Sequence, residues 1–122
     1  MTATSIDPPA DELVSISVSG TDSIVLVTAA GEIDSSTAPS LREQLTELLD
    51  GTPREITVDM EAVTFLDSAG LCVLAAAHRR ATAQGTQLRV VASGRPVVRP
   101  LEITGLWDLL ALPPGAAQPT AV

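Results

Sequence analysis

The sequence predicts a single α/β domain in which a small mixed sheet of four to five strands packs with helices. Apolar and polar residues alternate along residues 14–19 and again along residues 56–60, a pattern typical of half-buried strands. Leucine-rich and alanine-rich runs without breakers separate the apolar segments. Strands that alternate with helices favour parallel neighbours joined by right-handed crossovers.

The first half of the chain predicts an arm, a hairpin and a helix. Residues 1–12 contain two adjacent prolines and few apolar residues, so we expect a flexible arm before a domain over residues 13–112. The turn residues 20–23 separate two strand-like segments, which predicts an antiparallel hairpin. The second strand is expected over residues 24–27. Leucines then recur at helical spacing between Pro39 and Gly51, which predicts a helix of about three turns.

The second half of the chain predicts two strands, a long helix and a short helical end. The strands are expected at residues 55–60 and 88–92, and the long helix begins near Ser68 and closes near Gly85. A short helical segment is expected at residues 97–101, interrupted at Pro100, followed by a half-buried element over 103–112 and a flexible tail over 113–122.

The composition excludes several classes of function. The formal net charge is -8 and the chain has no lysine, which argues against binding to nucleic acid or to an anionic membrane. No apolar run approaches the roughly 18 residues of a transmembrane helix. A single cysteine, Cys72, and the lack of a basic and apolar leader favour the cytoplasm.

Ser68, at the start of the long predicted helix, is the residue with the most chemical interest. The nucleophile pattern Gly-x-Ser-x-Gly is broken by Leu66, and His78 lies about 15 Å along the same helix, too far to take a proton from the serine. One cysteine and one histidine cannot build a metal site, and a phosphate-binding loop is lacking. We therefore expect no enzyme activity, no metal and no cofactor. A helix N-cap and a modification site both remain open for Ser68.

A helical wheel predicts a surface beside Ser68 for another protein. Leu71, Leu74, Ala75, Ala77, His78 and Ala81 fall on the side expected to face the sheet. Cys72, Val73 and Ala76 fall on the other side within the first two turns. Small apolar residues exposed beside a polar group are typical of a docking surface, although chance also produces such patches. Cys72 is interpreted as a small contact residue rather than a redox sensor.

Three segments together carry a family resemblance. They are Gly31-Glu32-Ile33-Asp34 followed by Ser36-Thr37-Ala38-Pro39, the strand Ile56-Thr57-Val58-Asp59, and Phe65-Leu66-Asp67-Ser68-Ala69-Gly70-Leu71. In this combination the chain resembles the STAS-domain anti-sigma factor antagonists of bacteria. The resemblance implies that an anti-sigma factor serine kinase phosphorylates Ser68 and that a phosphatase reverses the reaction. It also implies that the unphosphorylated protein binds the kinase and frees a sigma factor.

The resemblance also suggests which residues surround Ser68. Asp34 is expected close to it, and Asp67, Ala69, Gly70, Cys72, Val73 and Ala76 complete the expected partner-binding region. Ala69 stands where the family often has a second serine, and residues 113–122 cannot supply the family's C-terminal amphipathic helix.

Other interpretations of the same residues stay open. Asp34 is a candidate cap for the helix that follows it, and Asp67 for shaping the turn. An alternative function is a STAS subunit of a transporter or signalling complex that is not phosphorylated. Nucleotide binding is a weaker alternative, against which the lack of lysine argues.

Overall fold

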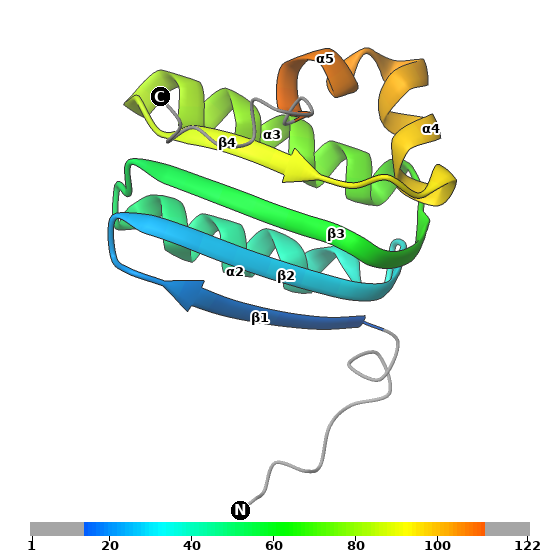
Figure 1. Ribbon diagram of the computed structural model, residues 1–122, viewed down its shortest axis with the longest axis horizontal. Helices are drawn as coiled ribbons and strands as arrows, with labels where there is room; N and C mark the ends of the chain where they lie inside the picture. The colour runs from blue at the N-terminus through cyan, green and yellow to red at the C-terminus, as the bar shows by residue number, and fades with distance from the viewer. Residues whose placement is uncertain (1–13, 112–122) are drawn as a thin grey trace, which may run out of the picture.

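The computed structural model describes residues 14–111, which form one four-stranded mixed sheet with helices (Figure 1). The strands follow the order β1-β2-β3-β4 across the sheet. The elements are, in chain order, β1 (Val14–Gly20), β2 (Ile24–Ile33), α2 (Ala38–Asp50), β3 (Glu55–Leu66), α3 (Ser68–Gln84), β4 (Gln87–Val91), α4 (Arg95–Thr104) and α5 (Leu106–Leu110). The predicted fold class is confirmed. The expected arm over residues 1–12 and tail over 113–122 lie outside the described residues.

The strand pairing confirms the predicted hairpin and crossovers. β1 pairs antiparallel with β2 from Val14 opposite Gly31 to Gly20 opposite Val25. β2 pairs parallel with β3, and β3 pairs parallel with β4. Both parallel pairs are joined through a helix, as a parallel connection requires.

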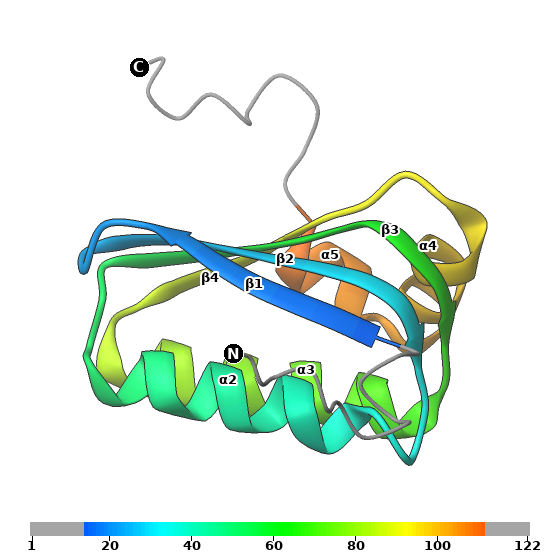
Figure 2. The ribbon, with the colours of Figure 1, turned by 90° about the horizontal axis from the view of Figure 1, so that it is seen from below.

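The sheet and its helices form two layers (Figure 2), with α2 and α3 side by side along one face of the sheet. Val27, Val58 and Val90 point into this interface and are fully buried, whereas Leu26 on the opposite face is exposed. Such alternation is expected of strands with one covered face. Figure 1 shows α4 and α5 beyond β4, at the far edge of the sheet from β1.

Two strands are longer than the alternation pattern predicts. β2 continues to Ile33 and β3 to Leu66, and their pairing shifts register twice, between Thr28 and Ala30 and between Gly31 and Glu32. The buried residues of β3 after Met60 are therefore spaced by three instead of two. A bulge inserts an extra residue and breaks the period of two. Residues 61–66 therefore lack the alternation that indicates a strand.

The predicted interruption at Pro100 is wrong, because α4 runs through this proline to Thr104. Pro100 lies within the second turn, where its ring removes one backbone hydrogen bond. Val97 and Leu101 on the same helix are almost completely buried. Their packing holds the helix together across the missing bond. The expected last element is present as α5, with Leu110 fully buried.

The buried face of α3 is turned toward α2 relative to the helical-wheel prediction. Val73, predicted on the outer side, is only 5% exposed. It lines a narrow hollow together with Leu45 and Leu49 of α2. Cys72 and Ala76 are exposed, as predicted. The helical-wheel prediction assumed that α3 packs only against a sheet, so it did not include the contact with α2.

This packing predicts different effects of truncating two neighbouring residues. We expect Val73→Ala to lower the free energy of unfolding by about 1 to 3 kcal/mol, because two buried methyl groups are lost. Cys72→Ala, the matched exposed control, should change it by less than about 0.5 kcal/mol. Urea denaturation measures both. Equal losses would contradict the orientation of α3.

Candidate functional site

The candidate site lies where the carboxyl ends of two adjacent parallel strands meet. Ile33, the last residue of β2, pairs with Leu66, the last residue of β3. The backbone N–H of Asp67 donates to the carbonyl oxygen of Ile33 at 3.2 Å. The loop that begins at Asp34 and the start of α3 are therefore held at the same end of the sheet.

Asp67 caps α3. Its Oδ1 accepts hydrogen bonds from the backbone N–H groups of Ala69, at 2.9 Å, and Gly70, at 3.4 Å. Its carbonyl oxygen accepts from the N–H of Leu71 at 3.0 Å. The side chain thus satisfies donors that a helix N-terminus leaves unpaired. The interpretation of Ser68 as the N-cap is wrong, and Asp67 does more than shape the turn.

Ser68 is the first residue of α3 and is exposed. Among the described residues its hydroxyl group forms no hydrogen bond. The cap is supplied by its neighbour, so the hydroxyl group has no structural task at this position.

Gly70 allows α3 to approach the strand ends closely. A Cβ atom here would lie 2.4 Å from Leu66 Cδ1 and 2.8 Å from Ile33 Cγ2, both shorter than a real carbon contact permits. Gly70 is buried. It therefore supports the start of α3 from beneath, next to Ser68, and packs instead of presenting a side chain.

Asp34 organises its own loop. Its Oδ1 accepts hydrogen bonds from the N–H and hydroxyl groups of Ser36, at 2.9 and 2.8 Å, and from the N–H of Thr37 at 3.1 Å. These bonds, led by the Ser36 hydroxyl, lower the pKa of Asp34 below its ordinary value, so the carboxylate is ionised at neutral pH. Thr37 occupies the N-cap position of α2, which removes Asp34 as the cap of that helix.

The exposed surface at this end combines small and apolar side chains with acidic ones. Cys72 and Ala76 continue along α3 from Ser68 and are exposed, while Ala69 is half-buried. Phe65 is 47% exposed at the end of β3, and its backbone pairs with that of Glu32. An exposed aromatic ring favours protein contact.

Phe65 was not among the residues that the sequence predicted for the site. A signal existed, because it is the only phenylalanine of the chain and lies two residues before Asp67. Its exposure was hidden because residues 61–66 were read as a connection instead of a strand.

The charged side chains of the two segments that meet at this end of the sheet are acidic. Asp34, Asp67 and the exposed Glu32 belong to the two converging segments. Within residues 14–111 the one ion pair joins Arg80 to Asp50, whose residues lie toward the carboxyl ends of α3 and α2. No group of three or more metal-binding side chains is found in this range, and none of its helices has the length and apolar character needed to cross a membrane.

The comparisons with known proteins agree with this architecture. The STAS domain family matches residues 15–117, most of the 122-residue chain. The chain belongs to the STAS domain family.

Two relatives and one solved structure similar to this chain are named anti-sigma factor antagonists. The anti-sigma-F factor antagonist RsfB of Mycobacterium tuberculosis is 33% identical over 97 residues, covering 80% of this chain and 79% of RsfB. The anti-sigma-B factor antagonist of Bacillus subtilis is 30% identical over 97 residues, covering 80% of this chain and 88% of that protein. A crystal structure of an anti-sigma factor antagonist from Mycobacterium paratuberculosis superimposes with a TM-score of 0.79 at 32% identity, covering 96% of this chain and 98% of that one.

The assignment of the cap to Asp67 predicts unequal effects of two adjacent alanine substitutions. Asp67→Ala removes the side chain that bonds the first turn, so we expect the free energy of unfolding to fall by about 0.5 to 2 kcal/mol. Ser68→Ala removes no internal bond and should leave stability within about 0.5 kcal/mol of wild type. Urea denaturation of both variants tests this. A larger loss for Ser68→Ala would restore the capping role to the serine.

Proposed function

We propose that this protein is an anti-sigma factor antagonist whose binding to an anti-sigma factor serine kinase is switched off by phosphorylation of Ser68. The observation that carries the proposal is the exposed Ser68 hydroxyl group, which forms no hydrogen bond within residues 14–111 while Asp67 caps the helix. The relatives named anti-sigma factor antagonists support the same role. In the unphosphorylated form the protein binds the kinase and a sigma factor is released.

The exposed beginning of α3 is the proposed docking surface. Ser68, Cys72 and Ala76 present small side chains along one face of the helix, so a partner can approach closely and exclude water. Phe65 adds an apolar ring at the adjoining strand end. Val73 and Gly70 support this surface from the buried side.

A phosphate on Ser68 changes the charge of this surface strongly. It adds about -1.5 to -2 charges at neutral pH. The N–H groups of Ala69 and Gly70, which would otherwise stabilise an anion at a helix N-terminus, are already bonded to Asp67. The new charge therefore lies beside an existing carboxylate. At a docked interface it is desolvated or set against the partner's acidic groups, which weakens binding.

The switch needs no change of fold. Ser68 forms no internal hydrogen bond among the described residues, so its modification breaks none. The sheet and the packing of Gly70 beneath the helix are unaffected. A serine phosphatase then restores the binding surface by removing the phosphate. The protein acts in the cytoplasm, where sigma factors work.

Phosphorylation is tested with the anti-sigma factor kinase from the same organism. Incubation with ATP followed by intact-mass spectrometry should show one added phosphate on the wild-type chain. Ser68→Ala should gain none, because Ala69 leaves no second serine at the helix start. Absence of phosphate on the wild-type chain, or equal gain by the variant, contradicts the proposal.

Binding is tested separately with a charged variant. Ser68→Glu should weaken kinase binding by at least about tenfold in calorimetry, because one carboxylate is desolvated at the interface. Its melting temperature should stay close to that of wild type. Thr82→Glu carries the same change in charge at an exposed position near the other end of α3 and should bind normally. Unchanged affinity of Ser68→Glu would favour a constitutive STAS subunit.

A further inference from the structure

A second surface lies along β1, at the edge of the sheet away from α4 and α5. β1 pairs with β2 on one side, and no segment within residues 14–111 pairs with its other side. In an antiparallel strand every second residue directs its backbone N–H and carbonyl groups away from its partner. β1 thus presents a row of backbone donors and acceptors at its free edge.

This edge lacks the features that usually prevent a further strand from pairing. Exposed edges are commonly protected by charged side chains, proline or bulges. β1 has the sequence Val-Ser-Ile-Ser-Val-Ser-Gly, with no charge and no proline, and its register with β2 is regular. By contrast, Ala111 forms a bridge with Val90 on the β4 side.

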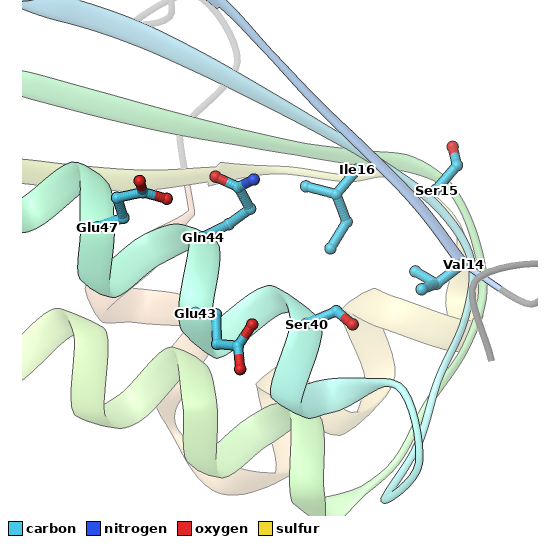
Figure 3. A pocket seen from close by; sticks show the side chains of 7 residues that line it. All are labelled: Val14, Ser15, Ile16, Ser40, Glu43, Gln44 and Glu47. Atoms are coloured by element: carbon cyan, nitrogen blue, oxygen red, sulfur yellow. The ribbon is translucent and has the colours of Figure 1, made fainter. Parts of the chain in front are cut away.

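A groove follows the same edge between β1 and α2 (Figure 3). One hollow of about 440 Å³ is lined by Val14, Ser15, Ile16, Ser40, Glu43, Gln44 and Glu47. A second hollow of about 460 Å³ lies between Val18, Ser19 and Gly20 of β1 and Glu47 and Leu48 of α2. Glu47 lines both, so the two hollows lie next to each other along β1 and are together called the groove.

The groove has an apolar side and an acidic side. Val14 and Ile16 point from β1 toward α2, whereas Ser15 points away (Figure 3), and Val18 farther along β1 is 43% exposed. Glu43 and Glu47 of α2 are exposed on the opposite wall. Neither hollow is lined by a basic residue.

We propose that β1 and this groove bind an extended basic segment of a partner protein, which adds to the sheet as a fifth strand. Its backbone pairs with the free edge of β1, and its groove-facing side chains are arginine or lysine. The aliphatic stems of these side chains cover Ile16 and Val18, while their charges meet Glu43 and Glu47. Strand addition supplies the affinity and the alternate side chains supply the specificity.

Charge argues against two other candidates for the groove, a second copy of this chain and residues 1–13 of the same chain. A second copy would bring its own Glu43 and Glu47 against the same acidic wall, which is repulsive in a chain of net charge -8. Residues 1–13 of the same chain contain two aspartates and one glutamate and no arginine or lysine. A basic partner segment can pair its backbone with the edge of β1 and its positive side chains with the acidic wall. No residue that lines the groove belongs to the proposed docking surface on α3, and the proposal does not depend on the proposed switch.

The test uses the full chain and a fluorescent, capped seven-residue peptide that alternates arginine with threonine. Anisotropy titration at low salt should show saturable binding below about 1 mM. The double variant Glu43→Gln/Glu47→Gln should bind about three- to tenfold more weakly, since two exposed ion pairs are lost. The matched control Glu102→Gln/Asp108→Asn removes the same charge from exposed positions of α4 and α5 and should bind as wild type.

Hydrogen exchange distinguishes strand addition from simple charge attraction. Saturation with the arginine–threonine peptide should slow exchange in residues 14–20. A peptide with the same side chains but N-methylated backbone amides should not, because it has no N–H groups to donate to a strand ladder. No saturable binding, equal losses in the two double variants or equal protection by both peptides overturns the proposal.

The hydrogen-exchange measurement also tests whether a second copy or residues 1–13 already fill the groove. If the edge amides of β1 are already fully protected and the peptide leaves them unchanged, another segment fills the groove and the proposal fails. Sedimentation velocity then separates the two cases. A dimer identifies a second copy, and a monomer identifies residues 1–13.

Discussion

The parallel pairing of β2 with β3 is the constraint on which the candidate site depends. It brings Ile33 and Leu66 to the same end of the sheet, and the bond from the Asp67 N–H to the Ile33 carbonyl oxygen fixes the start of α3 there. Gly70 then allows the helix to pack directly on these two apolar side chains. Because these contacts are buried and close, the position of Ser68 is set by the fold and not by a mobile loop.

The two residues at the helix start divide their roles. Asp67 uses its carboxylate to bond the first turn, and Ser68 keeps an exposed hydroxyl group that has no hydrogen-bond partner in the part of the chain that the structure describes. If the serine capped the helix, its phosphate would bond the N–H groups of the first turn and modification would alter the cap. Here the modification adds charge without removing a bond. In the proposed switch, Asp67 stabilises the helix start and Ser68 carries the change in charge. The surface charge can therefore change while the fold persists.

The molecule presents two different surfaces on either side of α2. One is the exposed start of α3, with small side chains and Phe65 nearby. The other is the groove between α2 and β1, with an apolar floor and an acidic wall. Charge on a surface steers encounters and selects partners more than it adds affinity. The proposed basic segment in the groove and the proposed kinase at α3 would therefore be selected by different side chains of this protein.

The sequence by itself determined the class of fold, the parallel crossovers, the limits of α2 and α3 and the position of Ser68 at a helix start, because local periodicity and turn residues encode these features. The motif around Asp67-Ser68 also located the candidate site. Only the tertiary structure decided that Val73 is buried, since α2 lies against α3, and that Asp67, not Ser68, is the cap. It also revealed Phe65 and the groove along β1. These depend on which elements become neighbours and on bulges that break the periodicity, and neither is written in a local pattern.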